Sequence, residues 1–298
     1  MNDYFGNVIK ELRTLKNITQ TQLSEGICTV KHLSRIENNL ANPTLLLLSE
    51  FSKRLGNELF DYIPYISEPN AYQLKREIQT ANDLFSKQKH DETLDLLLNS
   101  EILNNTDCTI VNQESAWLMG ALSNYVEVPI TISIEYYEYI LRKTREFGTI
   151  YELFDFPLSP LELRIMNSII VLYLKDSNFE VAETLLVKSI NNYERHNTHL
   201  TDDVYSRFLY NLSRLYLELN FYPKSVSVSK KGIDHCLKLN KTAYLADLCN
   251  IYGRASYKAD DIEEGKKYLR ISIELYKLVN AHNDYEKMYK TLKERYDL

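Results

Sequence analysis

Apolar residues recur along most of the chain at the three- and four-residue spacing that is typical of amphipathic helices. Up to residue 63 these patterns are short, and from residue 71 onward they lengthen and come in pairs. The chain holds only 8 glycines and 7 prolines, which favours long uninterrupted helices. We therefore predict an all-α protein.

Residues 19–37 predict two short helices joined by a tight turn. Thr19 and Gln22 have the spacing of a capping box, which starts a helix at Gln20. Gly26 ends that helix, and Thr29 can cap a second one. In the second helix the apolar residues share one face and the polar residues point outward. This is the geometry of a helix-turn-helix, which places its second helix in the major groove of DNA.

Three further helices complete a predicted five-helix domain at residues 1–63. The first covers residues 3–16 with Leu15 on its apolar side, and the fourth follows Pro43 with Leu45 and its neighbours buried. Residues 57–63 form the short fifth helix. Pro64 and Pro69 then bracket a predicted linker, residues 64–70. The side chains expected to contact phosphates or base edges of DNA are Arg13, Thr19, Gln20, Thr29, Lys31, His32, Ser34 and Arg35.

Three segments of residues 71–298 align without gaps as internal repeats. They begin at Ile170, Ser213 and Gly253, with periods of 43 and 40 residues. Each has Phe, Tyr or Ile nine positions later and small residues at positions twelve and nineteen, which let paired helices approach closely. The pattern resembles the tetratricopeptide repeat, whose period is about 34 residues. We expect a right-handed tetratricopeptide-like superhelix of about five repeats, with a concave groove suited to an extended peptide.

The repeat register also predicts which side chains line that groove. Positions on the first helix of each pair are rich in Arg and Asn, and an Asn amide can both donate to and accept from a peptide unit. Arginine adds bidentate pairing to a carboxylate. The predicted groove residues are Arg164, Asn167, Arg207, Tyr210, Asn211, Arg214, Asn250, Arg254 and Tyr257.

Charge and cysteine content narrow the picture further. The chain has a net charge of −6, yet basic and acidic residues balance within residues 1–66, so DNA binding must be local and requires two copies. The 4 cysteines form no CxxC pair and are read as reduced thiols. The sequence offers no signal peptide or membrane span, which predicts a cytoplasmic protein. Neither a catalytic constellation nor a metal or cofactor site is expected.

Two sets of motifs carry a family resemblance. Residues 5–56 resemble Cro/repressor-type regulators through R-x-x-K-x-x-T-Q-x-x-L and L-S-R-I-E. Together with the linker, the repeats, SKQKHDE and LYNLSRLYLELNFYPKS, the chain resembles the PlcR/Rgg/PrgX group of peptide-pheromone-responsive regulators of Gram-positive bacteria. The resemblance implies that Asn167 and Asn211 clamp a peptide backbone, that Lys87 and Lys89 form a basic end of the groove, and that Tyr285 faces the ligand.

These observations favour a homodimeric quorum-sensing transcription regulator that binds a short signalling peptide and a palindromic operator in double-stranded DNA. Two alternatives stay open. The repeats could form a protein-interaction scaffold beside an N-terminal domain without DNA-binding function. They could also serve dimerisation alone, in a regulator that needs no ligand. A polar, arginine-bearing groove favours the peptide, because a dimer face should be apolar.

Overall fold

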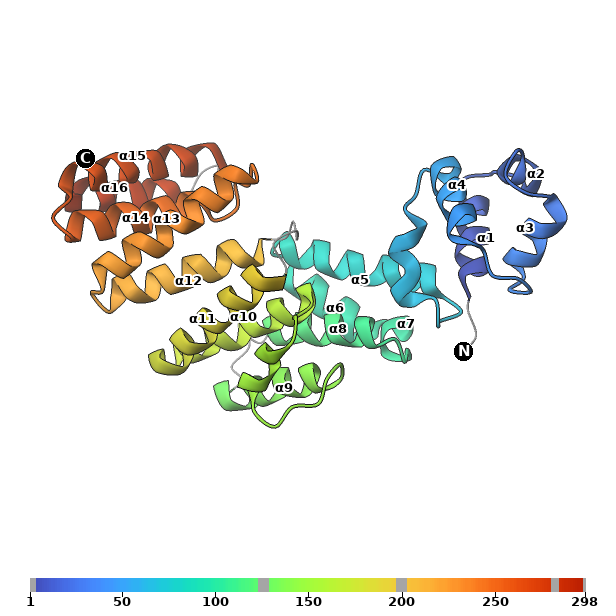
Figure 1. The fold of residues 1–298 in the computed structure, drawn as a ribbon, viewed down its shortest axis with the longest axis horizontal. Helices are drawn as coiled ribbons and strands as arrows, with labels where there is room; N and C mark the ends of the chain where they lie inside the picture. The colour runs from blue at the N-terminus through green and yellow to red at the C-terminus, as the bar shows by residue number, and fades with distance from the viewer. Residues whose placement is uncertain (1–3, 123–128, 197–202, 280–283, 297–298) are drawn as a thin grey trace. The chain divides into compact units, whose positions relative to one another are not determined.

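The computed structural model describes residues 4–122, 129–196, 203–279 and 284–296. Throughout these residues the regular structure is helical (Figure 1). The chain divides into two compact units, residues 1–146 and 147–298. The predicted all-α fold is confirmed, with a helix-turn-helix in the first unit and tetratricopeptide-like pairs in the second. In the described residues there is no helix with the length and apolar character that a membrane crossing requires.

The first unit begins with the predicted helix-turn-helix domain. Its elements are α1 (Phe5–Leu15), α2 (Gln20–Ser24), α3 (Val30–Glu37), α4 (Leu45–Leu55) and η1 (Leu59–Tyr65). Both halves of the capping box at Thr19 and Gln22 are present. Gly26 takes a φ of +70° in the turn, and Gly56 ends α4 in the left-handed conformation. The capping box and the glycine turn confirm the local signals read from the sequence at Thr19, Gln22 and Gly26.

Two expectations for this domain were wrong in detail. Leu15 is 58% exposed, and Leu45 and Leu46 are 71% and 72% exposed. A helix buries only a stripe of its surface, so consecutive leucines at the start of α4 cannot all face the core. Leu48 and Phe51, three residues apart, are the ones that do. In addition, the fifth helix is a 3₁₀ helix that includes Pro64, whose missing N–H disfavours a longer α-helix.

Polar contacts join the helix-turn-helix domain to the helix that follows it. The Asn7 amide donates to the carbonyl oxygen of Pro69 at 2.8 Å. Gln73 Nε2 donates to Glu11 Oε1 at 2.6 Å. Lys75, which is 8% exposed, pairs with Asp61 at 3.2 Å. Helix α5 is therefore in contact with residues that precede the predicted linker, and the role of residues 64–70 as the boundary between two functional domains stays a prediction.

The rest of the first unit packs helices in pairs. Its elements are α5 (Ala71–Ser86), α6 (His90–Asn99), α7 (Glu101–Asn104), α8 (Thr109–Leu122) and α9 (Ile130–Arg142). Helices α5 and α6 contact each other, as do α8 and α9. The pairing of helices expected from residue 71 onward is thus present, with the first pair interrupted at Ser100, whose side chain caps α7.

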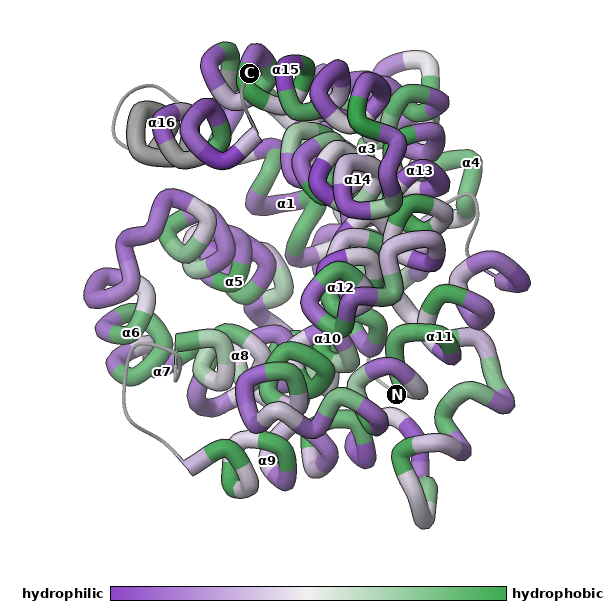
Figure 2. The backbone as a smooth tube through the Cα atoms, turned by 90° about the vertical axis from the view of Figure 1, so that its left-hand side faces the viewer, coloured by the Kyte–Doolittle hydropathy of each residue, from purple (hydrophilic) through white to green (hydrophobic). Residues whose placement is uncertain are grey.

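The second unit contains η3 (Ile150–Asp155) and the helical pairs α10 (Pro160–Lys175) with α11 (Phe179–His196), α12 (Val204–Glu218) with α13 (Tyr222–Lys238), and α14 (Leu245–Lys258) with α15 (Ile262–Val279). Helix α16 (Asp284–Tyr296) follows. Phe179, Tyr222 and Ile262 are the first residues of the second helices, as the repeat register predicts. Figure 2 shows hydrophobic and hydrophilic stretches alternating along these helices, in keeping with their amphipathic pattern.

The turns between the two helices of each pair repeat the same backbone conformation at the same position. Two residues before each second helix the backbone takes a positive φ, at Ser177 (59°), Asn220 (62°) and Asp260 (66°). Gln88 (59°) holds the same place before α6 in the first unit. A left-handed residue at a helix end satisfies the last carbonyl groups. The shared turn extends the repeat assignment to the α5–α6 pair, where the sequence pattern was weak.

Small residues in the repeats allow close helix packing. Ala182, Ser225 and Ser189 are fully buried, and Ser225 Oγ donates to the Ser213 carbonyl oxygen of the facing helix at 2.8 Å. A Cβ atom on Gly265 would lie 2.7 Å from the backbone nitrogen of Tyr257, so only glycine fits there. This confirms the reason for the small positions read from the sequence.

Candidate functional sites

Helix α3 presents the predicted recognition surface. Thr29 caps it by accepting a hydrogen bond from the His32 backbone N–H at 3.2 Å. Leu33 and Ile36 are fully buried and fix the helix against the domain core. Lys31 and Arg35 are exposed on the opposite side, while His32 and Ser34 are half-buried. The arrangement leaves polar side chains of the first turns available to a groove of DNA.

Arg13 and Gln20 were predicted to contact phosphates, but both side chains form hydrogen bonds within the domain. The Arg13 guanidinium donates from Nε to Glu37 Oε1 at 2.6 Å and from Nη2 to Glu37 Oε2 at 2.9 Å. Gln20 Nε2 donates to the same carboxylate at 2.7 Å. The Arg13 and Glu37 side chains are 12% and 1% exposed. This geometry supports a role in fixing α1, α2 and α3 together and gives no support to a direct phosphate contact by Arg13.

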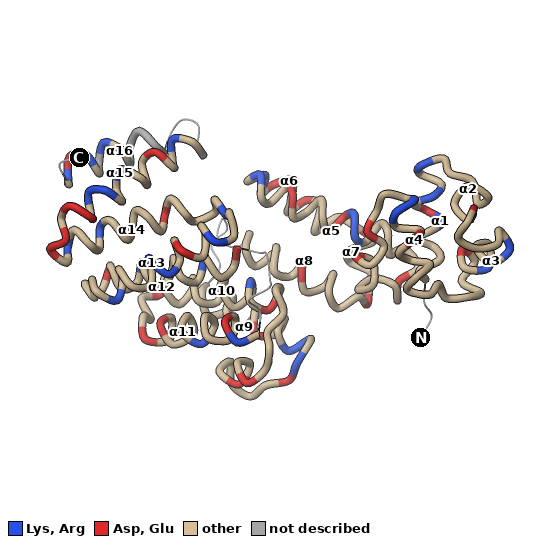
Figure 3. Tube along the Cα trace, turned by 45° about the horizontal axis from the view of Figure 1, so that its top comes forward, with Lys and Arg blue, Asp and Glu red and all other residues tan. Residues whose placement is uncertain are grey.

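Charges are mixed over the N-terminal helices. Basic and acidic positions are interspersed along α1 to α4 (Figure 3), in keeping with the neutral balance of residues 1–66. Some of the basic side chains are already paired, such as Lys53 with Glu50 at 2.7 Å. Phosphate attraction from one copy of the domain is therefore modest.

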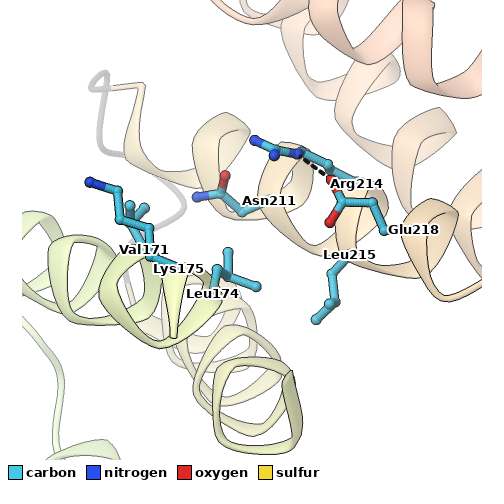
Figure 4. A pocket seen from close by; sticks show the side chains of 7 residues that line it. All are labelled: Val171, Leu174, Lys175, Asn211, Arg214, Leu215 and Glu218. Carbon is cyan, nitrogen blue, oxygen red and sulfur yellow. Dashed lines mark hydrogen bonds and ion pairs between the residues drawn. The ribbon is translucent and has the colours of Figure 1, made fainter. Parts of the chain in front are cut away.

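A pocket of about 230 Å³ lies between α10 and α12 in the second unit. Its apolar side chains are Val171, Leu174 and Leu215, and its polar ones are Lys175, Asn211, Arg214 and Glu218 (Figure 4). Arg214 Nε donates to Glu218 Oε1 at 2.8 Å. Both helices are the first of their pairs, which is where the repeat register places the groove.

Two predicted asparagines meet at this pocket. Asn211 Nδ2 donates to Asn167 Oδ1 at 3.0 Å, joining α12 to α10. Asn167 and Asn211 are 6% and 7% exposed. The bond uses one donor and one acceptor, so the pair retains an acceptor on Asn211 and donors on Asn167. A paired acceptor and donor complement the C=O and N–H of a peptide unit.

Next to the pocket, α12 and α14 bring aromatic and charged groups together. The Arg207 guanidinium lies 5.5 Å from the centre of the Tyr244 ring. The Tyr244 ring in turn lies 5.6 Å from that of Tyr210. Burial raises the pKa of Tyr210, and the nearby Asp247 carboxylate raises it further while Arg214 lowers it. Tyr210, which directly precedes Asn211 in the chain, thus links the pocket to this second group of side chains.

Family models match both parts of the chain. Residues 9–62 match a helix-turn-helix model, and residues 158–296 match the RNPP family C-terminal domain. The chain thus combines a helix-turn-helix domain with an RNPP family C-terminal domain. Comparison with curated protein sequences gives no significant match.

Solved structures resemble this chain over nearly its full length. PlcR of Bacillus thuringiensis, in complex with the peptide PapR7 and DNA, aligns with a TM-score of 0.73, 18% identity and 98% coverage of both chains. Apo PlcR aligns with a TM-score of 0.64, 18% identity and coverage of 97% and 99%. ComR from S. thermophilus, in complex with DNA and its signalling peptide ComS, aligns with a TM-score of 0.52, 16% identity and 98% coverage of both chains. At these identities the likeness establishes the shared fold.

The remaining predicted groove residues have varied surroundings. Arg164, Asn250 and Arg254 are half-buried on α10 and α14. Tyr257 packs edge-on against Tyr296, with ring centres 5.0 Å apart, as part of the core cluster under α16. The side chain of Tyr285 lies outside the described residues, and Lys87 and Lys89 belong to the first unit, where Lys89 pairs with Glu92 at 2.8 Å. Their roles in peptide binding stay predictions.

Three groups at the groove were missed by sequence reasoning. Lys175 and Glu218 line the pocket from the last turns of α10 and α12. Glu218 could have been found, because it lies four residues after Arg214 and such pairs meet on a helix. Tyr244 could not, because it begins α14 in a left-handed conformation with φ 60° that its sequence gives no reason to expect. Within the described residues there is no cluster of His, Cys, Asp or Glu suited to a metal ion.

Proposed function

We propose that this protein is a cytoplasmic, homodimeric quorum-sensing transcription regulator. Its α3 helices bind a palindromic operator in DNA, and its groove of first helices binds a short signalling peptide. The observation that carries the proposal is the presence in one chain of an exposed, capped recognition helix and a groove pocket with a buried pair of amides. The peptide- and DNA-bound complexes of the structurally similar PlcR and ComR support the same reading.

The size of the pocket favours a peptide over a compact small molecule. Its volume of about 230 Å³ lies below the roughly 300–1,000 Å³ of pockets that enclose a whole small ligand. A pocket of this size holds one part of a longer ligand. The neighbouring first helices α10, α12 and α14 contact one after another, and packed helix axes lie about 8–10 Å apart. An extended chain of about six residues, at ~3.3 Å per residue, spans them.

Dimerisation follows from the charge of the DNA-binding domain. A neutral domain with few free cations gains little from counterion release, so a single copy binds DNA weakly. Two copies on neighbouring half-sites combine their affinities and require half-sites about one helical turn apart. Peptide binding in the repeats changes how the two copies are arranged, and with it the affinity for the operator.

The DNA-binding part is tested by selecting a binding site from a random double-stranded pool with the full chain. We expect the selected site to show two-fold symmetry. The variants Lys31→Ala and Arg35→Ala should each bind it about 5-fold or more weakly, since base contacts are worth about 1–3 kcal/mol each. Fluorescence anisotropy at fixed salt measures the affinities.

The matched control is Lys53→Ala, which removes an exposed lysine of the same domain that lies on α4 and pairs with Glu50. Its affinity should stay within about twofold of the wild type, because an exposed pair contributes about 0–1 kcal/mol to stability and the side chain is not on α3. Specific binding that survives both α3 substitutions would refute the assignment of α3 as the recognition helix.

A further inference from the structure

The groove face of α12 and α14 carries arginine charges that the described residues do not neutralise. The Arg207 side chain makes no ion pair or hydrogen bond with a described residue, and its Nε is buried without a partner. The side chain of Arg254, on the next first helix, also has no ion pair or hydrogen bond within the described parts of the chain. A partly buried cation without a partner is costly to desolvate, so an incoming anion gains from pairing with it.

Two carboxylates on the same first helices, Asp247 of α14 and Glu218 of α12, already have hydrogen-bond partners. Asp247 accepts a hydrogen bond from the Tyr276 hydroxyl, and this contact raises the pKa of Tyr276 in addition to the effect of burial. Glu218 accepts from Arg214. Lys175 adds a further positive charge to the lining of the pocket. The four cations of this face, Arg207, Arg214, Arg254 and Lys175, outnumber these two carboxylates, so the groove carries an excess of positive charge in a chain whose net charge is −6.

Tyr244 orients the Arg207 guanidinium. Its backbone is held at φ 60°, a conformation that is uncommon for a bulky side chain, and its ring lies near both the guanidinium and the Tyr210 ring. A guanidinium stacked on an aromatic face keeps the N–H groups in its own plane free to bind a carboxylate in a bidentate manner. Lysine cannot reproduce this planar geometry.

We propose that the groove of α10, α12 and α14 selects an acidic peptide, with the Arg207 guanidinium binding one carboxylate of that peptide while its face stays against Tyr244. This rests on the proposed function, because it specifies the ligand of the same groove. The apolar side chains of the neighbouring pocket, Val171, Leu174 and Leu215, receive an aliphatic side chain of the same peptide.

Affinity selection with a synthetic peptide pool tests the proposal. The purified full chain is mixed with random-sequence peptides of about six residues, the length derived from the groove. Bound peptides are separated by size exclusion and sequenced by mass spectrometry. We expect them to be enriched in Asp and Glu relative to the pool. A recovered peptide should bind about tenfold or more tightly than its version with Gln or Asn at the acidic positions and an amidated carboxyl terminus.

Three variants assign this selectivity to Arg207. Arg207→Gln should remove the enrichment in acidic residues, and Arg207→Lys should keep the preference for charge with weaker affinity. Arg270→Gln removes an exposed arginine of α15 and should behave like the wild type. Thermal unfolding confirms that each variant is folded. If Arg207→Gln does not fold, the affinities of the wild type for the acidic and the neutralised peptides still test the proposal.

The outcomes separate this proposal from the function on which it rests. Bound peptides without acidic enrichment, or an enrichment that persists in folded Arg207→Gln, would overturn the role of Arg207 and leave peptide binding intact. If the wild type retains no peptide above the background of Asn211→Ala, the peptide-binding function itself fails. Loss of the enrichment in Arg270→Gln would show that the effect depends on net charge and would also overturn the assignment.

Discussion

The buried ion pair of the helix-turn-helix domain gives a prediction with a defined magnitude. Glu37 accepts two hydrogen bonds from Arg13 and one from Gln20, and its side chain is 1% exposed. Glu37→Gln keeps the shape of the side chain but removes its negative charge. The Arg13 guanidinium, 12% exposed, is then left buried without a counter-charge. Breaking a buried pair in this way costs about 3–5 kcal/mol.

Such a loss is large for one domain. Natural domains are stable by about 5–15 kcal/mol, so the variant domain stays mostly folded but opens far more often. Since about 1.4 kcal/mol corresponds to a factor of ten, amide hydrogen exchange in α1 and α3 should be roughly 100- to 4,000-fold faster than in the wild type. Hydrogen-exchange mass spectrometry on peptides that cover these helices measures this directly in the full chain.

Glu50→Gln is the matched control. The Glu50 and Lys53 side chains are 39% and 69% exposed, and a surface pair of this kind contributes about 0–1 kcal/mol. Exchange in the same helices should change by less than about fivefold in this variant. If Glu37→Gln accelerates exchange by no more than Glu50→Gln, the ion pair does not hold the three helices together, and Arg13 returns as a candidate for phosphate contact.

Two further predictions concern the repeat unit. Gly265→Ala places a Cβ 2.7 Å from the backbone nitrogen of Tyr257 and should lower the free energy of unfolding by about 1–3 kcal/mol. At Gly232 the three atoms nearest to an added Cβ belong to the Leu248 side chain, which shifts more easily than backbone, so Gly232→Ala should cost less. Urea denaturation compares the two variants, and equal costs would contradict the packing argument. The pKa of His235 lies below its ordinary value of 6.5 because burial and nearby lysines disfavour the charged ring. The unfolded chain therefore binds this proton more tightly, so the contribution of His235 to stability is complete above pH 6.5 and is lost as the pH falls through its folded-state pKa. His235→Gln should reduce the drop in melting temperature between about pH 7.5 and about pH 5.5, and an unchanged drop would exclude this histidine as its source.

Local signals in the sequence predicted much of this fold. The capping box at Thr19, the glycine that ends α4 and the start of each second repeat helix depend on neighbouring residues, so the sequence displays them directly. The pocket lining was predicted in part, because Asn211 and Arg214 occupy fixed places in the repeat register.

The sequence pattern could not predict which side chains pair when they are far apart in the chain. Arg13 and Glu37 are 24 residues apart on different helices, and nothing local distinguishes a buried pair from a free arginine ready for phosphate. The exposure of Leu45 depends on which side of α4 meets the core. Tyr244 likewise lies against Arg207 of another helix, a contact between residues 37 positions apart that local sequence does not reveal. Tertiary packing decided all three.

The central claim is that a peptide in the groove controls the affinity of α3 for DNA. Its most direct test measures the affinity of the full chain for its selected DNA site with and without a saturating amount of a recovered peptide. We expect the peptide to change this affinity about 5- to 150-fold in the wild type, the usual range of coupling between two sites. Folded Asn211→Ala should bind the same DNA without responding to that peptide concentration. An affinity that is the same with and without bound peptide in the wild type would contradict the account.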